Sequence, residues 1–357
     1  MLSKFFSSAS GLFSRPSVAR RFLVETLLAS QVVQQSNPNV IDPAGVYIRA
    51  TAVNGGLIAG YAAQDGTQHV LRTAKSTNGG VSWFHQGEVY RADSTNFDID
   101  NAFPLSLPSG RILFAYRNHD RPNGQYTFYR ITISYSDDGG VTFQYLSTVA
   151  QRAASGFNGL WEPFLRIARD GSLQCYYSAE NASDDQDGFM QQSTDGGYTW
   201  SSPITVSGSG VTSRDGMIGV APIDGNGNLI AVFENTESGR FSIDSVLSHD
   251  DGRSWGQRAR VYTASNNGEA IAPQVINVGG TLVASFNTDE SIGATGAING
   301  QMKVVTSTNG GQTWGPSTVT GQAASHWPGL FTLDSSRFLA LYSKDGLGAV
   351  SQTYGLQ

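Results

Sequence analysis

Two glutamates stand where a carboxylate is unexpected. Glu162 lies between Trp161 and Pro163 in the apolar stretch LWEPFL, and Glu234 closes the apolar stretch LIAVFE. A carboxylate among apolar residues needs a partner or a chemical task, because moving its charge out of water costs free energy. Two carboxyl groups about 5 to 5.5 Å apart can serve as nucleophile and general acid/base in the cleavage of a glycosidic bond. The structural alternatives are an ion pair with an arginine for Glu162 and an ordinary exposed strand end for Glu234.

An internal repeat indicates which elements hold these glutamates. A turn residue is followed by a strand with apolar residues two and six positions on, and successive copies begin 53 to 61 residues apart. Glu234 lies seven positions after the start of the fourth copy, and no other copy has an acid there. The copies begin at Gly55, Gly110, Gly171, Gly227, Gly280 and Ser336.

A second repeat has the pattern Ser-x-Asp/Asn-x-Gly-x-Ser/Thr-aromatic and occurs five times, with starts 60, 57, 55 and 59 residues apart. Asn or Asp followed by Gly suits a tight turn, because these residues tolerate positive φ and form side-chain turn bonds. The copies are STNGGVSW (76–83), SDDGGVTF (136–143), STDGGYTW (193–200), SHDDGRSW (248–255) and STNGGQTW (307–314).

Six units of about 56 residues predict an all-β fold, a six-bladed β-propeller with four strands in each blade. A pair of β-sandwiches would not explain six equal periods. We expect the segment VYIRATAV to help close the ring, because no blade can bury both faces alone. The predicted innermost strands are VYIRATA (46–52), IDNAFPLSL (99–107), LWEPFLRI (160–167), MIGVAPI (217–223), IAPQVIN (271–277) and HWPGLFTL (326–333).

Composition excludes several classes of partner. The net charge is −6 and no basic stripe runs through the chain, which argues against a nucleic-acid partner. No apolar run approaches the roughly 20 residues that cross a membrane. The single cysteine, Cys175, cannot form an intrachain disulfide and is predicted to be a buried thiol. The five histidines show no metal-binding spacing, so we predict neither a catalytic metal nor another cofactor, and we expect a monomer.

The first 34 residues differ from the rest of the chain and form a predicted N-terminal extension, followed by one catalytic domain over 35–357. Lys4, Arg15, Arg20 and Arg21 precede the first acid, Glu25. This basic, Ser-rich and acid-poor start is typical of a transit peptide. A degraded secretory signal in FLVETLLAS and a disordered start are the alternatives.

The repeated turns resemble the Asp boxes of sialidase-type propellers, a strong indication of fold and a weak indication of function. Within that group the chain resembles glycoside hydrolase family 93, the fungal exo-1,5-α-L-arabinanases. The resemblance rests on GLWEPFL, on SRDGMIGVAPI with LIAVFEN, and on the YIRA start, and it spans roughly residues 38 to 355. It implies a secreted retaining enzyme of plant cell wall degradation that releases arabinobiose from arabinan.

The resemblance also implies roles for individual residues. It makes Glu162 the nucleophile and Glu234 the acid/base, although the two roles could be exchanged. Tyr342 would hydrogen-bond the nucleophile, and the alternative is a core aromatic residue. Arg49 would hold a sugar hydroxyl or orient a carboxylate, and the alternative is a structural ion pair.

Polar and aromatic residues near the starts of the predicted inner strands are candidates for binding sugar hydroxyls or rings. Turn capping and core packing are the alternative roles. The candidates are Asp98, Asp100, Asn101, Trp161, Arg214, Asp215, His326 and Trp327.

Two other functions remain open. A sialidase must bind a carboxylate and uses three arginines for it, but the fifth and sixth predicted inner strands contain no arginine. A non-catalytic propeller that binds glycans or proteins is also compatible, since one fold hosts many functions. A neutral sugar polymer suits the residues better than either.

Overall fold

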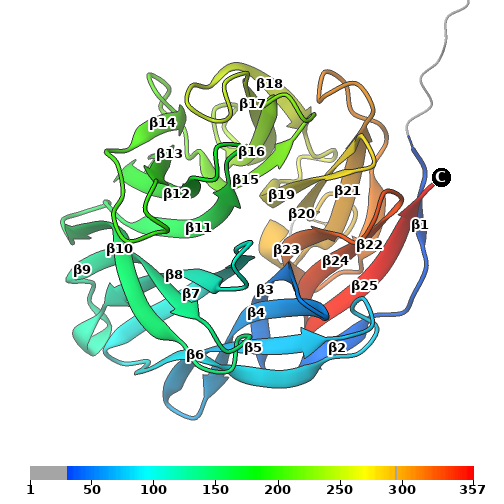
Figure 1. Ribbon diagram of the computed structural model, residues 1–357. Helices are drawn as coiled ribbons and strands as arrows, with labels where there is room; N and C mark the ends of the chain where they lie inside the picture. Colours follow the sequence, from blue (N-terminus) through cyan, green and yellow to red (C-terminus); the bar gives the residue numbers. More distant parts are fainter. Residues whose placement is uncertain (1–29, 294–295) are drawn as a thin grey trace, which may run out of the picture.

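The computed structural model describes residues 30–293 and 296–357, which form a ring of six antiparallel sheets around a central channel (Figure 1). The predicted six-bladed all-β propeller is confirmed. Each predicted innermost strand is the first strand of its blade. We call the face at which these strands begin the upper face, and the opposite one the lower face.

The strands follow the blades in chain order. Blade 1 contains β3 (Gly45–Val53), β4 (Gly56–Asp65), β5 (Gln68–Ser76) and β6 (Phe84–Asp93). Blade 2 contains β7 (Phe97–Ser106), β8 (Ile112–Asp120), β9 (Phe128–Ser136) and β10 (Gln144–Ala153). Blade 3 contains β11 (Leu160–Ile167), β12 (Leu173–Ala182), β13 (Asp185–Ser193) and β14 (Ile204–Ser207).

The second half of the ring repeats this order. Blade 4 contains β15 (Gly216–Pro222), β16 (Leu229–Asn235), β17 (Ser242–Ser248) and β18 (Gly256–Tyr262). Blade 5 contains β19 (Ala270–Val278), β20 (Thr281–Thr288), β21 (Gln301–Ser307) and β22 (Thr318–Gly321). Blade 6 contains β23 (Ser325–Thr332), β24 (Arg337–Lys344) and β25 (Gly348–Leu356), and short 3₁₀ turns lie at η1 (Pro122–Gly124) and η2 (Ala297–Asn299).

The ring is closed by the N-terminal part of the described chain. Strands β1 (Val32–Gln34) and β2 (Asn39–Asp42) both pair with β25 and complete blade 6 (Figure 1). The expectation that VYIRATAV supplies the closing strand was wrong, because that segment is β3, the innermost strand of blade 1. The predicted boundary at residue 34 also cuts through this closure, since β1 belongs to the propeller. The predicted targeting segment otherwise lies outside the described residues.

The Asp-box turns connect the third and fourth strands of blades 1 to 5 and satisfy their own polar groups. In the second box, Asp138 accepts bonds from the Thr142 hydroxyl at 2.6 Å and from the Val141 and Thr142 amides at 3.0 Å, and Ser136 donates to it at 2.7 Å. The fourth box has Asp251 where the others have Gly, and that residue takes φ 60° and binds Arg166 at 2.6 Å. These bonds hold each turn shut, so the boxes are structural.

The core lies between neighbouring blades. The residues six positions into the strand repeat are all buried there, and so is Cys175. These residues are Tyr61, Tyr116, Tyr177, Phe233, Phe286 and Tyr342. Within the ranges that the structure describes, no helix has the length and apolar character needed to span a membrane.

Candidate active site

Every innermost strand contains an irregularity at the same place. Near its upper end each strand slips in register against its neighbour, as at a β-bulge. The residue at the slip has a positive φ of 46° to 57° in all six blades, although none of the six is glycine. Such backbone costs free energy and persists where the surroundings enforce it, often at functional sites. We call these residues the bulge ring: Tyr47, Asn101, Glu162, Met217, Ala272 and Trp327.

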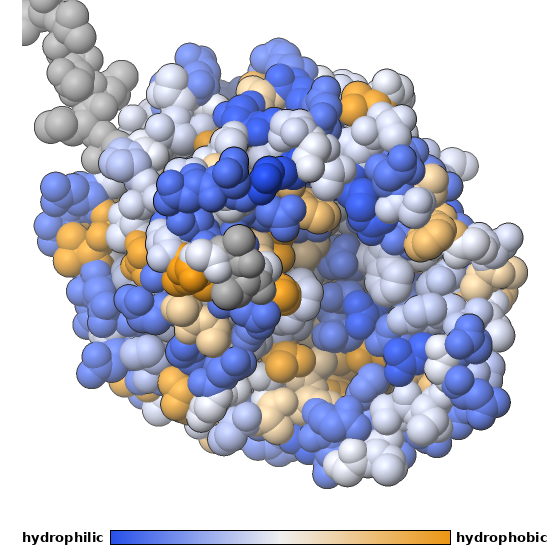
Figure 2. Space-filling model, turned by 180° about the vertical axis from the view of Figure 1, so that it is seen from behind, coloured by the Kyte–Doolittle hydropathy of each residue, from blue (hydrophilic) through white to orange (hydrophobic). Residues whose placement is uncertain are grey.

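The bulge ring converges on the channel axis. Tyr47, Met217 and Ala272 form one buried cluster, and Trp327 packs against it with its ring centroid 6.0 Å from that of Tyr47. Figure 2 shows the upper face, which is hollowed near its middle. Glu162 is the only ring member with an ionisable carboxyl group, so the strand bulge of blade 3 carries an acid to the place where four other blades supply apolar or aromatic side chains.

Glu162 is held in a poorly solvated position. Its Oε2 atom is buried and has no hydrogen-bond partner among the described residues. Burial raises the pKa of Glu162 to about 8, and the charge of Glu234 adds to this rise. Arg117 and a hydrogen bond with Ser178 act in the opposite direction. The carboxyl group therefore retains a proton at neutral pH unless Glu234 or a bound molecule changes its surroundings.

Glu234 reaches the same region from the end of β16. Its residue pairs across the blade with Gly216 of β15, where a Cβ atom would come 3.5 Å from Oε1. The Oε2 atom accepts a 2.6 Å hydrogen bond from the amide of Ala272, the bulge residue of the next blade. Burial raises the pKa of Glu234 to about 7, although the Ala272 amide and Arg214 lower it.

The contact between Glu234 and the next blade follows a pattern. In register-equivalent positions, Ser178 accepts from the Met217 amide at 3.0 Å and Ser343 accepts from the Tyr47 amide at 3.1 Å. A hydroxyl thus satisfies the bulge amide in blades 3 and 6, whereas a carboxylate does so in blade 4. Because Ser178 accepts from Met217 through its oxygen, its proton is free to be donated to Glu162.

Arg117 organises the acids that begin β7. It contacts Asp98 at 3.0 Å, Asn101 at 3.1 Å and Asp100 at 3.5 Å. Burial raises the pKa of Asp100 against the effect of Arg117, whereas at Asp98 the Arg117 charge and a 2.6 Å bond from Tyr126 outweigh burial and lower the pKa. A polar pocket of about 430 Å³ borders this group, between blades 1 and 2. Asp100 and Arg117 line it, so hydroxyl groups of a ligand have partners there.

Arg49 lies just below the bulge ring. Its guanidinium carbon is 4.2 Å from the centroid of the Tyr47 ring, and Nη1 donates to the carbonyls of Ile48 and Trp327 at 2.8 and 3.2 Å. Burial lowers the pKa of Arg49, while Tyr47, Asp100 and Glu162 raise it. Its hydrogen bonds run to backbone carbonyls, which disfavours the structural ion pair considered for it.

Several predicted residues face elsewhere. The Tyr342 hydroxyl donates to Gln352 at 2.9 Å within the core beside blade 5, so the structure does not bring Tyr342 to the glutamates. Asp215 is fully buried against Arg258 at 2.6 Å and braces the start of β15. Arg214 binds Glu180 at 2.8 Å and acts on Glu234 only through its charge.

The aromatic candidates divide between core and ring. Trp161 packs against His119, Tyr126 and Tyr129 in an aromatic cluster, under the Arg117 guanidinium at 5.3 Å from its ring. Trp327 is a member of the bulge ring. Its neighbour His326 bonds Asp345 at 2.8 Å, which ties β23 to the end of blade 6.

The sequence argument missed Tyr47, Ser178 and Met217. Aligning the six inner strands on Glu162 would have found the ring, because three of its members precede proline: Glu162, Ala272 and Trp327. In the described part of the chain, no three His, Cys, Asp or Glu side chains are grouped so that they could hold a metal ion.

Fold and site together define a class: an Asp-box β-propeller with a coupled pair of carboxyl groups at the upper end of its channel. The sequence matches the family described as BNR repeat-like domain over residues 30–284 and 147–346. The chain therefore belongs to the BNR repeat-like domain family. No curated protein sequence matches it significantly.

Solved structures give similar propellers. The Penicillium chrysogenum α-L-arabinanase bound to arabinobiose has a TM-score of 0.68 at 21% identity, covering 92% of this chain and 97% of that one. The Fusarium graminearum family GH93 α-L-arabinofuranosidase bound to arabinobiose gives 0.65 at 20%, with the same coverage. The NanB sialidase of Streptococcus pneumoniae gives 0.59 at 11%, covering 92% and 70%. At these identities the likeness establishes the fold.

Proposed function

We propose that this protein is a retaining glycoside hydrolase that acts from the chain end of 1,5-α-L-arabinan and releases arabinobiose. The observation that carries the proposal is the carboxyl pair, Glu162 and Glu234, in which burial raises both pKa values and the charge of one acts on the other. Two such groups with opposite protonation states are what retaining hydrolysis requires. The similar structures that bind arabinobiose support the choice of sugar.

We assign Glu162 as the nucleophile, in agreement with the family resemblance. A hydrogen bond with Ser178 and the nearby charge of Arg117 both favour its anion. Glu162 attacks the anomeric carbon while Glu234 protonates the departing oxygen, so one carbon–oxygen bond forms as the glycosidic bond breaks. Glu234 then takes a proton from water, which releases the sugar and restores Glu162.

A neutral sugar fits the site better than a sialic acid. A sialidase needs arginines free to bind the substrate carboxylate. Here Arg117 is engaged by Asp98 and Asp100, and Arg214 is engaged by Glu180. The bulge ring contributes no cation.

The experiment is hydrolysis by the full-length chain of linear 1,5-arabinan and, separately, of a chromogenic sialoside, with products resolved by chromatography. We expect arabinobiose as the sole early product, and its loss in Glu162→Gln and Glu234→Gln. Glu88→Gln, on the exposed strand β6, is the matched control and should retain full activity. Free sialic acid would favour the sialidase, and no product from either substrate would favour a binding propeller.

The pH profile gives a second test. With one pKa near 7 and one near 8, a single proton resides on the pair between these values. We expect turnover to fall below about pH 7, where both carboxyl groups become protonated, and above about pH 8, where both are ionised. A profile flat from pH 5 to 9 would contradict the assignment of this pair.

A further inference from the structure

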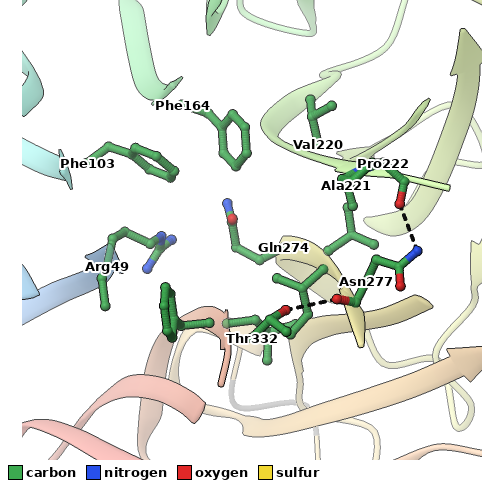
Figure 3. Close-up of a pocket in the computed structure, with 14 residues that line it drawn as sticks. Arg49, Phe103, Phe164, Val220, Ala221, Pro222, Gln274, Asn277 and Thr332 are labelled. Atoms are coloured by element: carbon green, nitrogen blue, oxygen red, sulfur yellow. Dashed lines mark hydrogen bonds between the residues drawn. The ribbon is translucent and has the colours of Figure 1, made fainter. Parts of the chain in front are cut away.

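A second cavity occupies the lower half of the central channel, beyond the bulge ring. Its volume is about 300 Å³, and every residue that lines it follows the bulge of its own inner strand. The walls are largely apolar and aromatic, as Figure 3 shows. They include Phe103, Phe164, Val220, Leu330 and Phe331. We call this cavity the lower channel.

The lower channel contains one charged group, the Arg49 guanidinium. Arg49 is only 2% exposed, and its Nε and Nη2 atoms are buried without hydrogen-bond partners among the described residues. A buried guanidinium with two unused N–H groups carries a desolvation penalty that a bound anion would relieve. Nε and Nη2 lie on one edge of the guanidinium, and this edge matches the two oxygens of a carboxylate.

A second polar group enters the same space. Figure 3 shows the Gln274 side chain reaching into the hollow, with its amide between the Arg49 guanidinium and the ring of Phe164. None of the residues that line the lower channel is acidic. The cavity therefore combines a cationic fork, an amide and aromatic walls.

The rim of the lower channel is fixed by hydrogen bonds. Asn277 donates to the carbonyl of Pro222 at 2.9 Å, and the Thr332 hydroxyl donates to the carbonyl of Asn277 at 3.0 Å (Figure 3). These bonds join blades 4, 5 and 6 around the opening. The cavity is thus preformed, and its volume is at the small end of the range for ligand pockets.

We propose that the lower channel binds a small aromatic monocarboxylate. Its carboxylate would pair with Nε and Nη2 of Arg49, and its ring would lie against Phe103, Phe164 and Phe331. A phosphate dianion suits the site less well, because apolar walls would not replace its hydration. This binding is separate from the proposed hydrolysis, since the bulge ring lies between the lower channel and the carboxyl pair.

Calorimetric titration of the full-length protein with benzoate, benzyl alcohol and inorganic phosphate tests the proposal. We expect benzoate to bind at least about tenfold more tightly than its neutral analogue benzyl alcohol, because only benzoate uses the arginine fork. Phosphate should give no saturable heat. Equal affinities for benzoate and benzyl alcohol, or no binding of benzoate, would overturn the proposal.

Two variants locate the site. Ala50→Leu adds bulk to the cavity wall away from the carboxyl pair, and we expect it to weaken benzoate binding at least about tenfold while arabinan hydrolysis is unchanged. Arg49→Met should bind benzoate and benzyl alcohol equally. If Arg49→Met does not fold, Ala50→Leu and the neutral analogue still decide the matter. Undiminished benzoate binding in Ala50→Leu would place the ligand elsewhere and refute the site.

Discussion

The carboxylates of the Asp-box turns and those of the upper mouth are opposites. Asp138 has hydrogen-bond donors for both oxygens, from the side chain and amide of Thr142 above all, and these bonds lower its pKa to about 2. Glu162 has a buried oxygen with no partner, and burial raises its pKa to about 8. The first kind is repeated around the propeller and stabilises it, whereas the second occurs once and is held in readiness. Satisfied acids are structural here, and unsatisfied acids are the candidates for chemistry.

Glutamine substitution in the carboxyl pair should give the largest effect. Glu162→Gln and Glu234→Gln each keep the side-chain volume but remove the nucleophile or the proton donor. We expect kcat on arabinan to fall by about a thousandfold or more, with a melting temperature at or above that of the native protein. Comparison of initial rates and thermal melts checks this. Normal turnover in either variant would show that the unsatisfied acids are not the reacting groups.

Removal of the hydroxyl beside Glu162 should have a smaller effect. Ser178→Ala deletes a hydrogen bond that lowers the pKa of Glu162, so the pH limits of activity should move upward and kcat should fall about tenfold. Ser343→Ala is the matched control, because Ser343 satisfies a bulge amide in the same way but in another blade. Ser178→Thr should restore most of the activity. Identical pH profiles for Ser178→Ala and Ser343→Ala would reduce Ser178 to a structural role.

An Asp-box substitution should show the reverse behaviour. Asp138→Ala removes the acceptor for the Thr142 and Val141 groups, so the turn loses its internal bonds. We expect a fall in melting temperature of roughly 2 to 4 °C. The kcat/KM on arabinan should stay within about twofold of the native value. A large loss of activity without loss of stability would break the distinction between the two kinds of acid.

The two kinds of acid should also respond oppositely to pH in thermal melts. The pKa of Glu162 is raised, so its contribution favours the native state at low pH and is lost as pH rises through about 8. The pKa of Asp138 is lowered, so its contribution is present at neutral pH and is lost as pH falls toward about 2. Relative to the native protein, Glu162→Gln should therefore gain about 2 °C between pH 5 and pH 9.

The matched measurement is Asp138→Asn, whose deficit at pH 7 should disappear as the medium approaches pH 2. Melts that shift in the same direction for both variants would contradict the opposite electrostatics of the two regions.

The sequence predicts the propeller well because its period is written in turn residues. Boxes and strand repeats locate the blades and the inner strands, and the apolar surroundings of Glu162 mark it as exceptional. The bulge ring was not predictable from turn chemistry, because its positive-φ residues are Tyr, Asn, Glu, Met, Ala and Trp rather than glycine. Tertiary packing, not local preference, imposes that backbone.

The expectation for Tyr342 failed for a reason that was already present in the repeat. Tyr342 and Phe233 share the sixth position, whereas Glu234 occupies the seventh. Successive residues of a strand point to opposite faces of the sheet. A tyrosine in the register of Phe233 therefore enters the core between blades, and a residue in the register of Glu234 faces the next inner strand.

The closure of blade 6 has a consequence for biosynthesis. The ribosome makes Val32 to Gln34 long before Tyr354 to Leu356, with which they pair. Until translation reaches those last residues, β1 and β2 have no hydrogen-bonding partner, and the growing chain carries open strand edges that favour aggregation. A nascent propeller of this kind depends on either rapid completion of the chain or protection of its first strands until the last arrives.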